Sequence, residues 1–272
     1  MSQTFQRVQV MGVLNVTPDS FSDGGKYFSV DKAVEAGLRM VKEGADILDI
    51  GGESTRPGSE DVSFEEELER VLPVIVTLKK VTAVPISVDT YKARVAEEVL
   101  KLGVEMINDV TAMRGDHEMI SVLAKFSNKV LIMFSKDSTP RTTDRVCHYD
   151  DVIATLLGFL GERIDVGVAR GIERERFLVD PGMGAFVSSD PKYSLEILRR
   201  LEEFKALGLP IVIGASRKGF IGKVLDVPVD ERLEGSLACA AWAVAHGAQI
   251  IRTHDVQATR RMVDMTQALL GS

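Results

Sequence analysis

The chain has 272 residues, of which 45% are hydrophobic and 27% charged, with a formal net charge of −7 and a pI near 5.3. This length fits one (β/α)8 barrel of about 250 residues or two small domains, and the apolar content excludes a disordered chain. The acidic balance argues against a nucleic-acid groove, and we find no secretory signal and no apolar run of about 20 residues, so we expect a cytoplasmic protein with no nucleic-acid or membrane partner.

Short apolar runs alternate with longer segments of helical periodicity along the whole chain. We predict strands at residues 8–14, 46–50, 85–88, 105–107, 130–133, 177–179, 210–213 and 249–252. We predict helices at residues 31–43, 64–80, 92–102, 116–126, within 150–170, and at 192–207, 234–246 and 256–270. Asp31 is expected near the first helix N-cap, and Ser63 with Glu66 forms a predicted capping box. Glycines are expected to end five helices: Gly44, Gly103, Gly171, Gly208 and Gly247.

Eight repeated strand–helix units favour an α/β fold of the TIM-barrel type, (β/α)8, and no linker divides residues 1–272, so we predict a single domain. An open doubly wound sheet is the alternative arrangement. The first unit lacks the Gly-x-Gly-x-x-Gly turn of dinucleotide folds, and the chain has no Gly-Lys-Ser/Thr phosphate loop. NAD and ATP are therefore disfavoured as ligands.

Polar residues stand at the ends of several predicted strands, which is the catalytic face of a barrel. Asp89, Asn108 and Asp180 offer the acceptors and donors that match a flat heterocycle with NH, amino and carbonyl edges. Capping of a strand end is the alternative role for any one of them, and three at corresponding ends favour a pocket. The weaker candidates each fit the cap of a turn or helix: Asp49, Asp109 and Asp255.

A second group of residues is suited to an anion. Arg252 and His254 precede the last helix, whose N-terminal amides add further donors for a phosphate. Lys218 either reaches the pocket or is a solvated lysine, and Arg217 fits a surface position. The four histidines show no metal-ligand spacing, so a hard cation such as Mg²⁺, held by substrate oxygens and by Asn15, fits better than zinc. Cys147 and Cys239 are expected to be buried, reduced thiols.

Two loops near the predicted strand ends contain residues suited to a lid. The first, residues 15–25, contains Phe21 and Asp23, and the second, residues 51–58, contains Arg56 between glycines. Phe21 either packs locally against the barrel mouth or closes over the reacting centre together with Asp23.

Five dispersed motifs resemble those of the dihydropteroate synthases over nearly the whole chain. They are Leu14–Gly25 (LNVTPDSFSDGG), Gly51–Gly58 (GGESTRPG), Asp180–Gly182 (DPG), Ser216–Lys218 (SRK) and Arg252–Val256 (RTHDV). The resemblance implies a TIM-barrel, pterin-binding transferase that acts as a homodimer in folate biosynthesis. It would join p-aminobenzoate to 6-hydroxymethyl-7,8-dihydropterin diphosphate, with Mg²⁺ as cofactor, releasing diphosphate and forming 7,8-dihydropteroate.

The resemblance also implies roles for individual residues. Pterin contacts fall on five residues: Asp89, Asn108, Met133, Asp180 and Lys218. Contacts to diphosphate fall on Asn15, Arg252 and His254, and Asn15 would also contact Mg²⁺. Residues that help to order and close the reacting centre fall on Phe21, Asp23, Thr55 and Arg56. The implied mechanism is SN1-like, because diphosphate leaves before the arylamine attacks a pterin-stabilised methylene cation.

The departures from the family pattern gather where p-aminobenzoate would lie. The usual arene-packing Phe is replaced by Ala185, with Phe186 one residue later, and a common Ser is replaced by Gly219. The Met-His-Met run of the fifth strand is replaced by Met133-Phe134-Ser135. We therefore expect Phe186 and the backbone N–H of Gly219 to serve the arene, in a remodelled pocket with reduced sulfonamide sensitivity.

Two other functions remain as alternatives. One is a pterin-binding methyltransferase acting on a corrinoid protein, which has no use for a diphosphate clamp. The other is a non-catalytic pterin-binding homologue, which has no use for a lid that excludes water. The clamp segment of Arg252 and His254 and the lid residues Phe21, Asp23 and Arg56 favour the synthase over both.

Overall fold

The computed structural model describes residues 7–17, 26–55 and 58–271. Eight parallel strands form one sheet in the order β6-β5-β4-β3-β2-β1-β8-β7. The strands are β1 (Gln9–Asn15), β2 (Ile47–Gly51), β3 (Ile86–Asp89), β4 (Met106–Asp109), β5 (Lys129–Met133), β6 (Phe177–Asp180), β7 (Val212–Ile213) and β8 (Ile250–Thr253). An isolated bridge between Val179 of β6 and Ile211, the residue before β7, closes the sheet into a barrel. The (β/α)8 barrel predicted from the sequence is confirmed.

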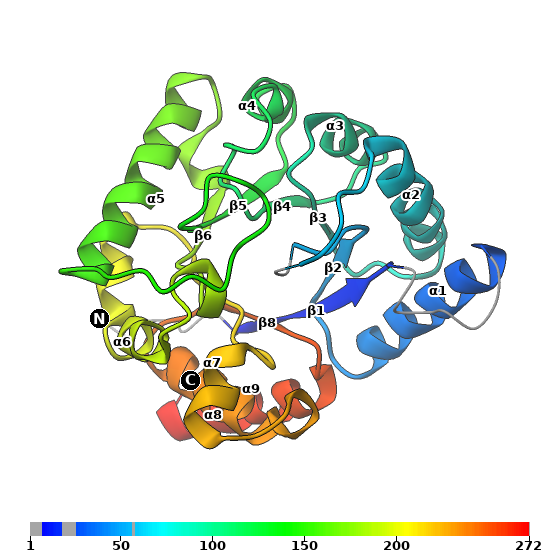
Figure 1. Ribbon diagram of the computed structural model, residues 1–272. Coiled ribbons are helices and arrows are strands. Elements are labelled where there is room, and N and C mark those ends of the chain that lie inside the picture. Colours follow the sequence, from blue (N-terminus) through cyan, green and yellow to red (C-terminus); the bar gives the residue numbers. More distant parts are fainter. Residues whose placement is uncertain (1–6, 18–25, 56–57, 272) are drawn as a thin grey trace.

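Helices surround the strands, as Figure 1 shows along the barrel axis. They are α1 (Lys26–Lys42), α2 (Phe64–Val81), α3 (Ala93–Lys101), α4 (Met119–Leu123), α5 (Val152–Ala169), α6 (Pro191–Arg199), α7 (Gly219–Leu225), α8 (Leu233–Ala245) and α9 (Val256–Leu270). The apolar side chains between strands and helices form one large buried cluster, because each element presents an apolar face to the other layer. No helix in the described ranges is both long enough and apolar enough to cross a bilayer.

The limits of α2, α3, α8 and α9 agree with the predicted ranges to within one residue, whereas α4 (Met119–Leu123) is shorter than the predicted helix at 116–126. Helix α1 begins at Lys26, so Asp31 lies inside it and the predicted N-cap is wrong. The predicted helix at 192–207 is α6 followed by a 3-10 helix at Leu201–Leu207. Helix α7 was not predicted, because seven residues with two glycines carry too little periodicity.

Capping at the start of α2 is confirmed in its first half. The backbone N–H of Glu66 donates to the Ser63 hydroxyl at 3.1 Å. The Glu66 carboxylate, however, accepts from Arg70 one turn later instead of from the Ser63 backbone. All five predicted helix-end glycines have positive φ, from 67° to 102°, as left-handed terminal residues require.

Inside the barrel, side chains are arranged in layers. A small buried apolar cluster takes one residue from each of seven strands: Met11, Ile47, Met106, Leu131, Leu178, Val212 and Ile250. Because side chains alternate across a strand, the residue two positions later points inward again, one layer closer to the carboxyl ends. That rule determines which residues form the candidate site.

Candidate functional site

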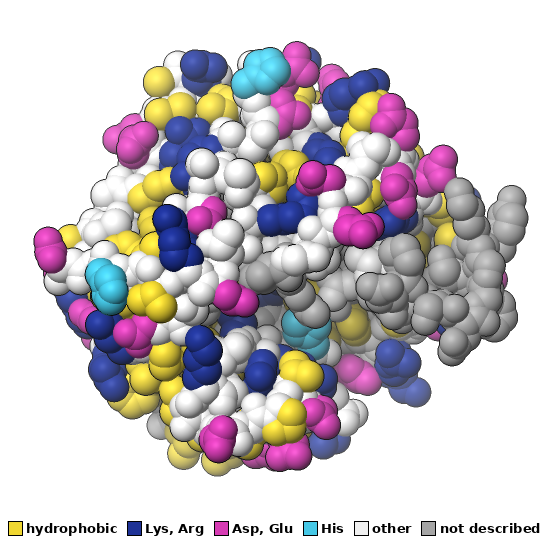
Figure 2. Space-filling view, viewed as in Figure 1, with side chains coloured by type: hydrophobic (Ala, Val, Ile, Leu, Met, Phe, Trp, Pro, Cys, Tyr) yellow, Lys and Arg dark blue, Asp and Glu magenta, His cyan; other side chains and the backbone are white. Residues whose placement is uncertain are grey.

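The inward layer nearest the carboxyl ends of the strands is polar. Two positions after the apolar layer stand Asp49 on β2, Asn108 on β4, Met133 on β5, Asp180 on β6 and Arg252 on β8. Strand β3 contributes Asp89, which pairs in register with Asn108, and β1 ends at Asn15, in register with Gly51. The structure therefore brings Asn15, at the end of β1, together with the pterin and diphosphate candidates on β3, β4, β5, β6 and β8. Figure 2, drawn from the same side as Figure 1, shows basic and acidic side chains close together around the centre of the face.

Arg252 is the centre of an ion-pair network. Its Nε donates to Asp49 Oδ2 at 2.7 Å, and its Nη2 donates to Asp89 Oδ2 at 2.8 Å. The amide of Asn108 donates to the same Asp49 oxygen at 3.0 Å. Asp49 is fully buried, and its other oxygen has no hydrogen-bond partner among the described residues. Asp49 thus fixes the positions of the Arg252 and Asn108 side chains through hydrogen bonds to one of its oxygens.

Asp49 does not have the capping role that its position in the sequence suggests. It caps nothing that the structure describes, because its contacts are to Arg252 and Asn108. The available signal was a carboxylate inside an otherwise apolar strand, which is rare unless the charge is paired. Asp109, by contrast, is a confirmed turn cap, since its two oxygens accept from the backbone of Thr111 and Met113 at 2.8 Å each.

The carboxylate of Asp180 lies beside a space that Gly214 leaves open. Its Oδ1 accepts from the Gly182 backbone at 2.7 Å, and its side of the barrel is lined by Gly214. A Cβ on Gly214 would lie 3.7 Å from Asp180 Oδ2 and 3.9 Å from the Arg252 Cβ. Lys218 adds a positive charge that acts on Asp180. A flat ligand can therefore approach the carboxylate edge without meeting a side chain at position 214.

Burial changes the proton affinity of these groups. It raises the pKa of Asp89 to about 7, because burial and the Asp49 carboxylate outweigh the attraction of Arg252. Burial likewise raises the pKa of Asp180, against the opposing effect of Lys218. Burial alone would lower the pKa of Arg252, but Asp49 and Asp89 raise it above its ordinary value. The guanidinium therefore stays charged while Asp89 exchanges a proton near neutral pH.

We expect the free energy of unfolding of the ligand-free protein to fall as the pH rises from 5 to 7, relative to that of an Asp89→Asn variant. The carboxyl group has a pKa of 3.8 when unfolded and about 7 when folded, so the folded state binds more protons between these values. Stability then declines as pH rises, by at most about 1.4 kcal/mol per pH unit. Denaturant titrations of both proteins at several pH values measure the difference, and parallel curves would contradict it.

The segment after β7 faces the segment after β8. The Ser216 hydroxyl lies 3.1 Å from His254 Nδ1 and accepts from the His254 backbone at 3.2 Å. Arg217 is bound by Asp255 through two bonds, of 2.6 and 2.9 Å, and does not point to the polar layer. Arg217 is exposed, so the expectation that it lies at the surface is confirmed. Asp255 was expected to cap a turn or a helix start, but its side chain pairs with Arg217 and makes no capping bond to α9. Together with the N-terminus of α9, Ser216 and His254 provide several donors beside Arg252.

The predicted arene residues lie next to Lys218. Residues Gly184–Phe186 form the 3-10 turn η3, and the Lys218 ammonium lies over the Phe186 ring, 4.8 Å from its centroid. Gly219 is the first residue of α7, directly after Lys218. Phe134, which follows β5, is buried and packs edge-on against Phe159 of α5 at 5.1 Å. Phe186 and Gly219 therefore flank one lysine, as a pocket wall requires.

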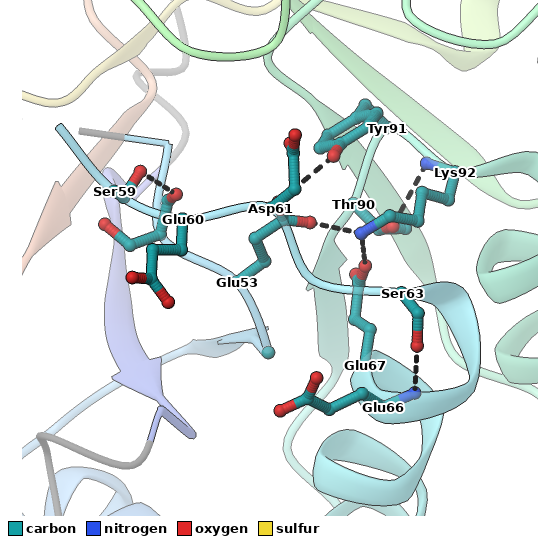
Figure 3. Close-up of polar contacts among 12 residues, drawn as sticks. Glu53, Ser59, Glu60, Asp61, Ser63, Glu66, Glu67, Thr90, Tyr91 and Lys92 are labelled. Atoms are coloured by element: carbon teal, nitrogen blue, oxygen red, sulfur yellow. Dashed lines mark hydrogen bonds and ion pairs between the residues drawn. The ribbon is translucent and has the colours of Figure 1, made fainter. Parts of the chain in front are cut away.

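The loop after β2 is fixed at its base by buried charges, shown in Figure 3. Glu53 accepts from the Tyr91 hydroxyl at 3.1 Å and pairs with Lys92, and the Lys92 ammonium also donates to Glu67 at 2.5 Å. Thr55, two residues after Glu53, is half-buried. The predicted lid residues Phe21, Asp23 and Arg56 lie outside the described residues. The role of Glu53 was not predicted, because its partners are distant in sequence.

A metal site formed by protein alone is not present in the described ranges, which contain no cluster of three His, Cys, Asp or Glu side chains suited to a cation. Asn15 ends β1 on the polar face, where a Cβ on the neighbouring Gly51 would lie 3.9 Å from its side-chain oxygen. One amide oxygen fits a hard cation that takes its remaining ligands from a substrate and water. Cys147 and Cys239 are both free, but each is only half-buried, so the expectation that they are buried is wrong.

Comparisons with known proteins agree along nearly the full length of the chain. Residues 11–254 match the family model described as pterin binding enzyme. A dihydropteroate synthase of Bacillus subtilis is 43% identical, over 98% of this chain and 90% of the relative. A Clostridium difficile dihydropteroate synthase, solved in the presence of pteroic acid, is 45% identical, with a TM-score of 0.90 over 99% of both chains. That of Xanthomonas albilineans, solved with 4-aminobenzoic acid, is 42% identical, with a TM-score of 0.91 over 98% of this chain and 94% of the other.

Proposed function

The chain belongs to the family of pterin-binding enzymes and is a transferase related throughout its length to the dihydropteroate synthases, and we propose that it catalyses their reaction. The reaction joins 6-hydroxymethyl-7,8-dihydropterin diphosphate to p-aminobenzoate in folate biosynthesis, and it yields 7,8-dihydropteroate and diphosphate. The observation that carries the proposal is the polar layer, in which acceptors for a bicyclic ring adjoin donors for an anion within one barrel mouth.

The pterin lies against the strand ends of β3, β4 and β6. Asp180 and Asp89 accept from the amino and NH groups of the ring, while the amide of Asn108 and the ammonium of Lys218 address its ring nitrogens and carbonyl. The side chain of Met133, two positions after the apolar layer on β5, supplies an adaptable apolar contact. Support comes from the space beside Gly214, which leaves the Asp180 edge accessible.

The diphosphate lies toward β8 and the start of α9. Arg252, His254 and the α9 amides stabilise the charge that develops as the C–O bond breaks. The carboxylates of Asp180 and Asp23 offset the positive charge that remains on the pterin and methylene. Mg²⁺ held by Asn15 and the diphosphate would supply further neutralisation of the leaving group. Phe21, Thr55 and Arg56 help to exclude water, which would otherwise capture the cation.

The arylamine enters between η3 and α7. The Phe186 ring offers an apolar face, and the Gly219 backbone N–H at the start of α7 offers a donor to the carboxylate. No protein nucleophile is required, because the amine itself attacks the methylene. The reaction therefore needs two adjoining subsites, and Lys218 lies between them: its charge acts on Asp180, and its ammonium stands over Phe186.

A direct assay tests this function. Purified protein is incubated with the pterin diphosphate, and released diphosphate is measured with and without p-aminobenzoate and with and without Mg²⁺. We expect release that depends on both additions, with an equal amount of dihydropteroate formed. Release without the arylamine, or no release despite pterin binding, would favour a methyltransferase or a non-catalytic homologue and overturn the proposal.

We expect weaker sulfonamide inhibition than in relatives with a Phe at position 185 and a Ser at position 219. A sulfonamide resembles p-aminobenzoate but extends beyond its carboxylate, so the shape of the wall at Ala185 and Gly219 discriminates between them. Inhibition constants for sulfamethoxazole are compared between the wild type and the double variant Ala185→Phe, Gly219→Ser. Tighter inhibition of the double variant is the expected result, and equal constants would refute the expectation.

We also propose a homodimer that acts in the cytoplasm. Large apolar side chains are exposed on or near the last three helices: Leu225, Val229, Trp242, Met265 and Leu269. Exposed apolar groups of this kind are typical of an interface between subunits. Light scattering after size exclusion distinguishes a dimer from a monomer. The two free cysteines are compatible with a reducing compartment.

A further inference from the structure

The loop that follows β5 connects two separate walls of the candidate site. This bridging loop, residues 135–143, runs in front of the strand ends in Figure 1. Its base is held by Arg114 from the β4–α4 connection, whose Nη2 donates to the Ser135 carbonyl at 2.9 Å and to the Asp137 carbonyl at 3.0 Å. Further contacts of the loop reach the η3 turn on one side and the loop after β2 on the other.

Toward η3, the contact is made by a buried lysine. The Lys136 side chain is only 2% exposed, and its ammonium donates to the Ala185 carbonyl at 2.5 Å and to the Asp137 carboxylate at 2.8 Å. It also donates to the Thr142 hydroxyl at 2.8 Å and to the Thr143 carbonyl at 2.7 Å. An ammonium has only three hydrogens, so with four acceptors in reach all three are used in hydrogen bonds.

Two further bonds attach the same turn. The Lys136 backbone N–H donates to the Phe186 carbonyl at 2.8 Å, and the Thr142 hydroxyl lies 2.8 Å from the Ala185 carbonyl. The turn that carries Phe186 is thereby held at two consecutive carbonyls from one loop. Because Phe186 stands under the Lys218 ammonium, a shift of η3 moves the ring relative to that charge.

Toward β2, the contact is made by an arginine. Arg141 pairs with Glu53 and with Asp61, and its Nε donates to the Ser59 carbonyl at 2.9 Å. Glu53 is itself fixed by Tyr91 and Lys92 (Figure 3). Arg141 therefore holds both ends of the segment that contains Thr55, since Glu53 precedes it and Ser59 follows it.

We propose that the bridging loop positions both walls of the site, with Lys136 and Thr142 determining the affinity for the arylamine and Arg141 determining the geometry of the β2 loop. These are positioning residues, because they act through Phe186 and through Thr55. The proposal rests on the proposed function, since it assigns the η3 wall to the arylamine. It extends that function by naming what fixes the second-substrate subsite.

The first experiment removes the donors on the η3 side. Lys136→Met keeps the chain length but leaves the Ala185 carbonyl and Asp137 without the ammonium. We expect its KM for p-aminobenzoate to rise at least about tenfold, with the KM for pterin diphosphate within about twofold of the wild type. Thr142→Val should raise the same constant about threefold or more, and Thr142→Ser, which restores the hydroxyl, should return it to the wild-type value.

The matched control is Lys129→Met. Lys129 begins β5, the same strand, and also donates to a carbonyl, that of Glu175 at 2.8 Å, but it lies at the opposite end of the barrel. It should leave both Michaelis constants unchanged. On the other side of the loop, Arg141→Met should lower kcat at least about fivefold while the KM for p-aminobenzoate stays within about twofold.

The outcomes separate the two proposals. A wild type without arylamine-dependent diphosphate release contradicts the proposed function. An active wild type with an unchanged KM for p-aminobenzoate in Lys136→Met contradicts the positioning role. If Lys136→Met does not fold, the Thr142→Val and Thr142→Ser pair decides, because equal KM values in the two variants would also overturn the proposal.

Discussion

Arg252→Ala is expected to lower kcat/KM for the pterin diphosphate roughly 30- to 1,000-fold. This corresponds to a loss of about 2–4 kcal/mol of transition-state stabilisation. Two losses combine. The leaving diphosphate loses a charged contact, and Asp49 and Asp89 lose the guanidinium that bonds to both at 2.7 and 2.8 Å. Asp49 is fully buried, so breaking this pair leaves an uncompensated charge and lowers the free energy of unfolding by about 3–5 kcal/mol.

The matched control for this variant is Arg260→Ala. Arg260 is a buried arginine that, like Arg252, forms an ion pair, with Asp46 at 3.0 Å, but Asp46 precedes β2 at the other end of the barrel. Its loss should reduce stability without changing KM. Initial rates of diphosphate release and thermal unfolding of both variants provide the comparison. An Arg252→Ala enzyme that retained kcat/KM within about threefold would show that the network is only structural.

Asp180→Asn is expected to weaken pterin binding by about 1.5–3 kcal/mol, which is roughly 10- to 150-fold. In the wild type, the Gly182 backbone N–H donates to Asp180 Oδ1 at 2.7 Å. The Asn side chain has the same shape, and its amide oxygen can still accept this bond. What is lost is the negative charge and one acceptor toward the open space beside Gly214. Isothermal titration with the pterin substrate measures the change in dissociation constant.

Asp109→Asn is the control for Asp180→Asn. Asp109 is also buried and ends β4, which β5 separates from β6, but its oxygens accept from Thr111 and Met113. Its replacement should lower stability and leave pterin affinity unchanged. Unchanged pterin affinity in Asp180→Asn, or an equal loss in both variants, would count against the role assigned to Asp180.

Much of the site could be predicted because strand ends are readable in a barrel sequence. Asp89, Asn108 and Asp180 each follow an apolar run, and parallel strands bring such residues to one face. The alternation rule explains why Asp49 was harder to judge: it stands inside its strand, and its importance depends on facing Arg252 across the barrel. That pairing joins residues 203 positions apart, which no local pattern reveals.

The loops were less predictable for a related reason. Lys136 looks like an ordinary surface lysine in sequence, yet its side chain is buried by Ala185, Thr142 and Asp137. Glu53 likewise depends on Tyr91, Lys92 and Arg141. Such contacts arise only when several loops meet above the barrel, so their residues carry no helical or strand period.

The most direct test of the central claim follows an oxygen atom. The pterin diphosphate is prepared with ¹⁸O in the oxygen that joins the methylene to phosphorus, and the products formed with p-aminobenzoate are analysed by mass spectrometry. Attack of the arylamine at the methylene predicts all of the label in diphosphate and none in the pterin product. Label retained on a hydroxymethyl pterin would mean cleavage at phosphorus, and it would contradict the reaction that Asp180, Lys218 and Arg252 are proposed to support.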